Sequence, residues 1–169
     1  MKKLYLAGGC FWCISDYFLM QDGVEEVNVG YSGGDEKGVT YEQVKAQKTG
    51  HRESIEIIYD ENVISLEKLL DLYFIYVDVL DEDGQGIDHG RSYTLALYYQ
   101  SKEEENLFTK KKEAVEKELK STIYLAIEPF KFFIEAEEEH QHFSLKNPEE
   151  FKEELIVSNR IDHLKMKEK

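Results

Sequence analysis

Short apolar runs alternate with polar, glycine-containing segments along the 169 residues, and this pattern predicts alternating strands and helices. The apolar run at residues 3–7 predicts a strand, which two glycines end. The next segment, residues 10–21, has apolar side chains at helical spacing. These are Phe11, Ile14, Phe18 and Leu19. Cys10 is therefore expected at a turn from a strand to a helix.

The rest of the chain continues the alternation. Further strands are expected at residues 24–32, 54–59, 92–99 and 122–127. Two helices are expected, one at residues 66–77 after the N-cap Ser65, and one that runs to about Lys120 after a capping box formed by Ser101 and Glu104. Polar segments at 33–51 and 78–90 are expected to be loops. The order β-α-β-β-α-β-α-β predicts an α+β fold, a two-layer sandwich with a ferredoxin-like core and an antiparallel or mixed sheet.

Length and charge restrict the possible classes of protein. A chain of 169 residues suits one domain, with a core at about 4–145 and a charged C-terminal extension at about 147–169 that is expected to be loosely attached. The net charge of −14 argues against binding to nucleic acid or to anionic membranes. The N-terminal apolar run is only LYLA, whereas a secretory signal needs about 7–15 apolar residues. A cytoplasmic protein is therefore expected.

The only two cysteines and the only tryptophan lie together in the segment Cys10-Phe11-Trp12-Cys13. At the first turn of a helix, free N–H groups and the helix dipole would favour the Cys10 thiolate. Cys13 follows on the same helix face, where Cβ atoms lie about 5–6 Å apart. A disulfide needs about 3.5–4.5 Å, so a bridge requires a small rearrangement and would be easily reduced.

Three other interpretations of the cysteine pair remain open. The pair could be half of a zinc site that His140 and His142 complete. It could be a thioredoxin-like redox motif, although such a motif opens a parallel βαβ unit and the following strands do not suit one. The two cysteines could also be inert and buried. A general thiol–disulfide oxidoreductase and a zinc-stabilised binding module are therefore the alternative functions.

The two polar loops carry reactive side chains next to predicted strands. The first contains Tyr41 and the sequence GHRES, in which Glu53 directly precedes a strand. The second contains GQGIDHGRSY, with Asp88 and Tyr93. Glycines that let a backbone approach a ligand, followed by a carboxylate and a phenol, are typical of a pocket wall.

Together these segments resemble the A-type peptide methionine sulfoxide reductases. GCFW is followed in order by GYSGG, TYE, TGHRESIEIIYD, GQGIDHGRSY and AEEEHQHF, over about residues 4–145. The resemblance implies that Cys10 is the nucleophile and Glu53 the proton donor. It implies that the substrate is bound by five residues: Phe11 and Trp12 around the S-methyl group, and Tyr41, Asp88 and Tyr93 around the sulfoxide oxygen.

The resemblance also implies a reaction and its partners. Cys10 would attack the sulfur of methionine-S-sulfoxide, free or in a protein, and become a sulfenic acid. The resemblance does not settle which thiol resolves it, but Cys13 is the only other thiol in the sequence and is therefore expected to form the disulfide with Cys10. A thioredoxin-type protein, or dithiothreitol in vitro, would reduce this disulfide. No metal or bound cofactor is expected, and the protein is expected to be a monomer. Many members have a small residue in place of Cys13, and tyrosines are common at Glu139 and Phe143, so the role of that late segment stays open.

Overall fold

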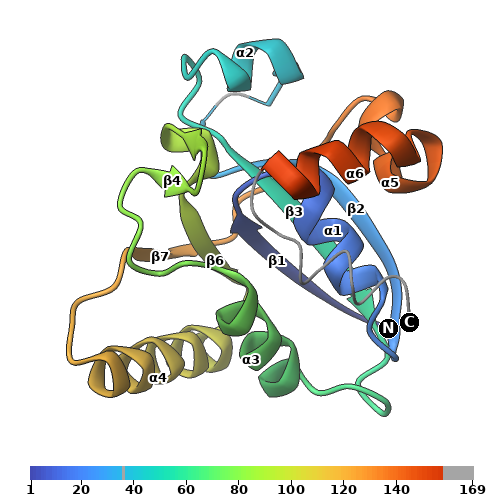
Figure 1. Ribbon diagram of the computed structural model, residues 1–169. Helices are drawn as coiled ribbons and strands as arrows, with labels where there is room; N and C mark the ends of the chain where they lie inside the picture. The colour runs from blue at the N-terminus through green and yellow to red at the C-terminus, as the bar shows by residue number, and fades with distance from the viewer. Residues whose placement is uncertain (36, 158–169) are drawn as a thin grey trace.

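A six-stranded sheet forms the centre of the computed structural model, which describes residues 1–35 and 37–157 (Figure 1). Its strands are β1 (Lys2–Gly8), β2 (Val24–Ser32), β3 (Arg52–Tyr59), β6 (Leu95–Tyr99), β7 (Leu125–Pro129) and β8 (Ile134–Glu135). They are arranged in the order β7-β6-β1-β3-β2-β8. Strands β6 and β7 run parallel, and the other neighbouring pairs are antiparallel. The order β6-β1-β3-β2 confirms the predicted ferredoxin-like core within a mixed sheet.

Three helices cover one face of this sheet. They are α1 (Phe11–Leu19), α3 (Leu66–Tyr76) and α4 (Lys102–Leu119). Their apolar faces share one buried cluster with Leu4, Leu6 and other inward side chains of the strands. Both predicted N-caps are present, because the Ser65 and Ser101 hydroxyls accept hydrogen bonds from the N–H groups three residues on. The capping box at Ser101 is incomplete, since the Glu104 carboxylate binds the Gln100 N–H instead.

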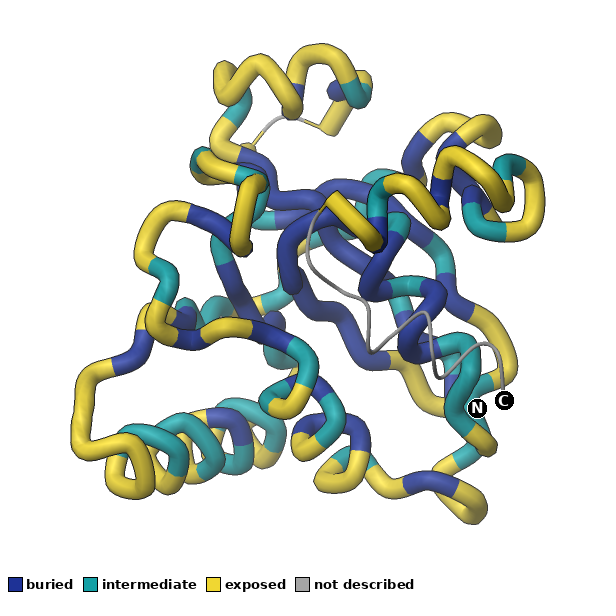
Figure 2. Tube along the Cα trace, in the orientation of Figure 1, coloured by how far each residue is buried: buried dark blue, intermediate teal, exposed yellow. Residues whose placement is uncertain are grey.

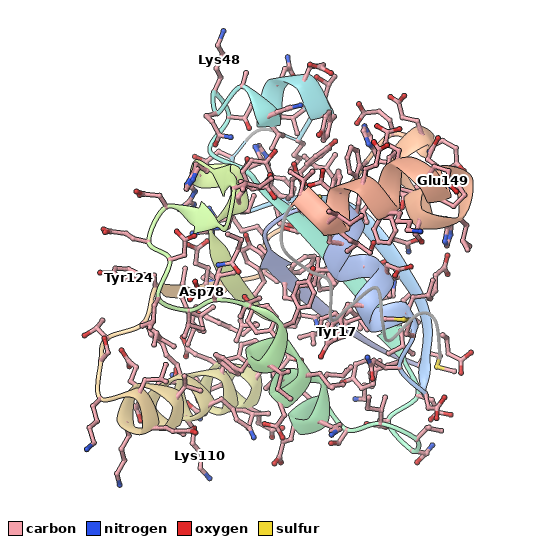
Figure 3. The ribbon with its side chains drawn as sticks, in the orientation of Figure 1. Tyr17, Lys48, Asp78, Lys110, Tyr124 and Glu149 are labelled. Atoms are coloured by element: carbon pink, nitrogen blue, oxygen red, sulfur yellow. The ribbon has the colours of Figure 1, made fainter. Side chains whose placement is uncertain are left out.

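The opposite face of the sheet is covered by a loop. Tyr5, Ala7, Ala96 and Tyr98 form a small buried cluster there, and Phe130 and Phe133 pack on it. Figure 2 shows the buried strands at the centre of the molecule, with exposed backbone at its edges. Charged side chains such as Lys48, Lys110 and Glu149 lie on the outside in Figure 3. The fold is thus a two-layer sandwich with a thin second cover.

The two segments predicted to be loops contain short regular elements. The first contains α2 (Tyr41–Lys45), which begins at a complete capping box formed by Thr40 and Gln43. The second contains the hairpin of β4 (Gly84–Gln85) and β5 (Asp88–His89), and a 3₁₀ turn, η1 (Arg91–Tyr93), follows. The strand expected from Ser92 therefore begins at Leu95, and the strand expected from Thr122 begins at Leu125.

The C-terminal extension is not loosely attached over the part that the structure describes. After the 3₁₀ turn η2 (Glu138–His140), the helices α5 (Phe143–Lys146) and α6 (Pro148–Val157) lie beside α1 in Figure 1. Phe151 and Leu155 of α6 are 3% and 0% exposed. The prediction was wrong for residues 148–157 because these two apolar side chains, one helical turn apart, face α1. Residues 158–169 lie outside the described residues. None of the helices described at residues 1–35 and 37–157 has the length and apolar composition that crossing a membrane requires.

Candidate active site

Cys10 lies at the junction of β1 and α1, as the sequence predicts. Gly9, with a φ of 86°, makes the turn, and Cys10 is the N-cap of the helix. Gly8 packs closely against the helix, because a Cβ atom at this position would force the end of the Ile14 side chain to move. The two glycines therefore bring the first turn of α1 directly against the end of the sheet.

Glu53 reaches the same helix end from β3. The antiparallel register pairs Leu6 of β1 with Ile55 of β3, so Glu53 lies two residues further along, beside the end of β1. Its carboxylate Oε1 accepts a hydrogen bond from the Phe11 N–H at 3.1 Å. The residue is 1% exposed, and Oε2 makes no hydrogen bond of good geometry among the described residues, although the Tyr93 hydroxyl lies close enough to interact with the carboxyl group. An acid is thus fixed at the start of α1 with one oxygen available to a ligand.

Burial raises the pKa of Glu53 to about 8. The hydrogen bond from Phe11 acts in the opposite direction, and the negative charge of Asp88 adds to the increase. A carboxyl group with this pKa is mostly protonated at neutral pH. Glu53 can therefore give a proton to a bound oxygen atom.

An aromatic cluster surrounds the first turn of α1. The Trp12 ring stacks on Phe143 at 3.9 Å between centroids and 8° between planes. The Trp12 indole N–H donates to Nδ1 of His140 at 3.2 Å, and the His140 ring stacks on Tyr41 at 4.2 Å. Phe11 is 0% exposed beneath them, whereas Trp12 is only half-buried. Of the predicted aromatic pair, Trp12 is thus the ring with a surface accessible to a substrate.

The three predicted polar residues also lie near Cys10 and Glu53. Tyr41 comes from α2, Asp88 from β5 and Tyr93 from η1. Burial is the main cause that raises the pKa values of Tyr41 and Tyr93, and the charges of Glu53, Asp88 and Cys10 raise them further. Both phenols stay protonated at neutral pH, so they can donate hydrogen bonds to an oxygen atom of a ligand.

The two cysteines are free thiols, with Cys10 6% and Cys13 0% exposed. A hydrogen bond with Cys13, burial and the nearby acids Glu53 and Asp88 raise the pKa of Cys10 well above its ordinary value. The prediction of a stabilised thiolate was therefore wrong. The physical reason is that the Phe11 N–H at the helix start binds Glu53, and the Cys10 side chain makes no capping hydrogen bond.

Comparison with known proteins identifies the family. The sequence pattern described as "Peptide methionine sulfoxide reductase" matches residues 2–169. The chain belongs to this family. It is 43% identical over 166 residues to "Peptide methionine sulfoxide reductase MsrA" of Halalkalibacterium halodurans, covering 97% of this chain and 94% of that protein.

Two solved structures of a yeast protein are also similar. Reduced Mxr1 from Saccharomyces cerevisiae is 32% identical, covers 88% of this chain and 86% of that one, and has a TM-score of 0.82. The same protein in complex with Trx2 is 26% identical, covers 82% of this chain and 83% of that one, and has a TM-score of 0.56. The fold of this reductase family is thus the one that the sequence predicts.

The alternative sites suggested by the cysteine pair do not form among the described residues. His140 and His142 are not in the group of metal-ligating atoms around Cys10 and Cys13, and Nδ1 of His140 binds Trp12. The strand after α1 does not pair with β1, because β3 lies between β1 and β2. The parallel βαβ unit of a thioredoxin-like motif is therefore absent from this part of the reductase.

The sequence missed the part that the C-terminal segment plays in the site. His140 accepts the hydrogen bond of the Trp12 indole, and Phe143 stacks on the Trp12 ring. The side-chain oxygen of Gln141 accepts a hydrogen bond from the Val29 N–H of β2 at 3.0 Å, which attaches the segment to the sheet. The signal was present in AEEEHQHF, where apolar and ring-bearing residues interrupt a run of acids. The sequence left the role of this segment open, and the structure shows that Gln141 and His140 are buried.

Proposed function

We propose that this protein reduces methionine-S-sulfoxide, free or in proteins, with Cys10 as the nucleophile and Glu53 as the proton donor. One observation carries the assignment. Cys10 and a carboxyl group with a pKa of about 8 meet at the start of α1, beside the half-exposed ring of Trp12. Reduction of a methyl sulfoxide needs three groups: a thiol to attack the sulfur, a neutral acid to protonate the oxygen, and an apolar ring to bind the methyl group. The preference for the S-epimer follows from membership of the family.

The first step transfers the oxygen from the substrate to Cys10. Glu53 gives its proton to the sulfoxide oxygen, and hydrogen bonds from Tyr41 and Tyr93 stabilise the charge that develops there. The sulfur of Cys10 is oxidised by two electrons and becomes a sulfenic acid, while the substrate sulfur is reduced and leaves as methionine. The proton of the Cys10 thiol restores the acid form of Glu53, so the step takes up no net proton.

Binding of the substrate uses the remaining residues of the site. The flat face of Trp12 suits the S-methyl group, with Phe11 beneath it as support. Asp88 holds negative charge near the oxygen-binding side and helps to keep Glu53 protonated. The site thereby favours a sulfoxide whose sulfur carries a small apolar group, the methyl, and a polar oxygen.

The second step converts the sulfenic acid to a disulfide. Cys13 is within hydrogen-bonding reach of Cys10, so its thiol can attack the Cys10 sulfur and release water. We assign the subsequent reduction to a thioredoxin-type protein, in keeping with the complex of yeast Mxr1 with Trx2. Thiols and carboxyl groups supply or accept every electron pair and proton that the two steps exchange, so the mechanism requires no metal or resident cofactor. We place the protein in the cytoplasm as a monomer that acts alone on its substrate.

The test is a stereospecific assay with dithiothreitol as the reductant. The parent protein should convert the S-epimer of methionine sulfoxide to methionine and leave the R-epimer unchanged. Cys10→Ser should abolish the reaction, because a hydroxyl is a much weaker nucleophile at neutral pH. Reduction of an insulin disulfide without reduction of either sulfoxide would instead support a general thiol–disulfide oxidoreductase.

A further inference from the structure

Helix α6 brings a carboxylate to the cysteine pair. A carboxylate oxygen of Glu154 and the sulfur atoms of Cys10 and Cys13 all lie within 4.8 Å of one another. Glu154 is flanked on its helix by the buried Phe151 and Leu155, which belong to the same apolar cluster as both cysteines. The position of this carboxylate is therefore fixed by packing, and the helix that carries it lies beside α1 in Figure 1.

The second step of the proposed reaction needs a base close to the Cys13 sulfur. Cys13 must lose its proton when its sulfur attacks the sulfenic acid, because the thiolate is the nucleophile. Cys13 is 0% exposed, so bulk water has poor access to it. Glu53 has already been assigned to the oxygen-binding side, where the Phe11 N–H holds it. A different base, on the α6 side of the pair, is needed for Cys13.

We propose that Glu154 accepts the proton of Cys13 as the Cys10–Cys13 disulfide forms, an assignment that rests on the proposed function above. The Cys13 sulfur forms a bond to the Cys10 sulfur, and the bond from the Cys10 sulfur to its hydroxyl group breaks. The leaving hydroxide takes a proton from Glu53, and water departs. Glu154 then releases the Cys13 proton to solvent, for which its partial exposure suffices. Glu53 takes up one proton in exchange, so both carboxyl groups return to their starting forms and the step has no net proton change. No oxidant or reductant beyond the sulfenic acid is required.

A purely electrostatic role for Glu154 predicts the opposite effect of its removal. A negative charge near two thiols disfavours their thiolate forms. If Glu154 acted only through its charge, its neutralisation would make the thiolate of Cys13 easier to form and would speed disulfide formation. If Glu154 accepts the proton, its neutralisation slows that step. The sign of the change therefore separates the two roles.

The experiment compares Glu154→Gln with Glu153→Gln, its exposed neighbour on α6 with the same change in charge. Reduced enzyme is mixed with one equivalent of methionine-S-sulfoxide in the presence of a metal chelator, and samples are quenched in acid. Methionine release reports the first step, and free-thiol counts with mass analysis report sulfenic acid and disulfide separately. For Glu154→Gln we expect methionine release at least as fast as in the parent, because loss of the negative charge does not hinder Cys10. Disulfide formation should be slowed about 100-fold at pH 7, the lower end of general base catalysis. Glu153→Gln should match the parent in both steps.

The pH dependence provides a second measurement. Without a carboxylate to accept the proton, the Glu154→Gln variant depends on solvent to take the proton of Cys13, so its deficit should shrink as the hydroxide concentration rises with pH. Glu154→Asp, which keeps the carboxylate, should recover part of the rate at pH 7. Disulfide formation in Glu154→Gln that is as fast as or faster than in the parent overturns the proposal. Failure of the proposed function looks different, since the parent itself would then release no methionine or would keep a free Cys13 thiol.

Discussion

The main-chain N–H of Phe11 donates a hydrogen bond to Oε1 of Glu53 at 3.1 Å, across 42 positions of the sequence. This bond uses one of the N–H groups at the start of α1 that have no partner within the helix. It fixes a protonated acid beside the nucleophile, while the nucleophile itself stays a thiol at rest. In the proposed mechanism, this arrangement activates the substrate oxygen first and the thiol second.

Replacement of Glu53 by glutamine should slow the first step. Glutamine keeps the hydrogen-bonding shape but has no proton to give, and general acid help is typically worth about 10²–10⁴-fold. Methionine release in a single turnover should fall within that range. Glu56→Gln is the control, because Glu56 lies on the same strand but bonds Tyr5 on the opposite face of the sheet. A Glu53→Gln rate within about twofold of the parent rate would assign the proton to another group.

Glu53 should also lower the stability of the fold as pH rises. Its pKa is raised from 4.5 to about 8 in the folded protein, so the native state holds one more proton than the unfolded state between these values. The free energy of unfolding must then decrease as pH increases through that window, by up to about 1.4 kcal/mol per pH unit. Urea unfolding of the parent and of Glu53→Gln should give similar free energies at pH 4 and a more stable variant at pH 9. A constant difference across this range would contradict the raised pKa.

Removal of the Cys13 thiol should separate the two steps of the reaction. Cys13→Ser should release one equivalent of methionine in a single turnover, because the first step needs only Cys10. Multiple turnover with thioredoxin should collapse, since no disulfide forms. Dithiothreitol should restore turnover by attacking the sulfenic acid directly. Retention of full turnover with thioredoxin would show that Cys13 only packs against α6.

The apolar and polar pattern of a segment was enough to predict those strands and helices that depend only on their own residues. The strand at residues 24–32 has the predicted bounds, and Ser65 caps its helix as expected. Helix α2 was missed because its stability comes from the capping box at Thr40 rather than from apolar periodicity, with only Val44 buried. Helix α6 was missed for a related reason, since three charged residues, at positions 152–154, separate its two buried side chains and the segment as a whole is charge-rich.

The chemistry of the site depended on contacts that no single segment contains. The candidates Cys10 and Glu53 could be named from the sequence, and the fold brings them together. The raised pKa of Cys10 could not be predicted, because it results from Cys13, burial, Glu53 and Asp88 acting together. The position of Trp12 likewise depends on His140, which follows 128 residues later. Only the tertiary structure shows that these distant charges and rings lie near one thiol.

Replacement of His140 by phenylalanine should loosen Trp12 without removing a ring from the cluster. The indole N–H would lose its acceptor, while a phenyl ring can still stack on Tyr41. The bond is partly buried, and the loss of a typical hydrogen bond costs about 0.5–1.5 kcal/mol. KM for the sulfoxide should therefore rise several-fold, with a smaller change in kcat. Trp12 is the only tryptophan, so its fluorescence spectrum should shift in this variant. His142→Phe, at an exposed neighbouring position, should leave both the KM and the spectrum unchanged.

Truncation of Leu155 should expose the cysteine pair by weakening the contact between α6 and α1. Leu155 is 0% exposed in the cluster that contains Cys10 and Cys13, whereas its neighbour Ile156 is 51% exposed. Removal of a fully buried leucine side chain costs about 2–5 kcal/mol. If about 2 kcal/mol of this acts on the docking of α6, the undocked population rises roughly 30-fold, since 1.4 kcal/mol is a factor of ten. The thiols of Leu155→Ala should then react with a chromogenic disulfide reagent faster by that factor in the absence of denaturant.

Ile156→Ala is the matched control for this measurement, because it removes a similar side chain from the exposed side of the same helix. Its thiol reactivity should equal that of the parent. Urea unfolding of Leu155→Ala, followed by circular dichroism, shows whether the sheet remains folded under the conditions of the thiol assay. Equal thiol reactivity in the parent and in a folded Leu155→Ala protein would mean that undocking of α6 does not control access to Cys13, and that the reagent reaches the pair from the Trp12 side.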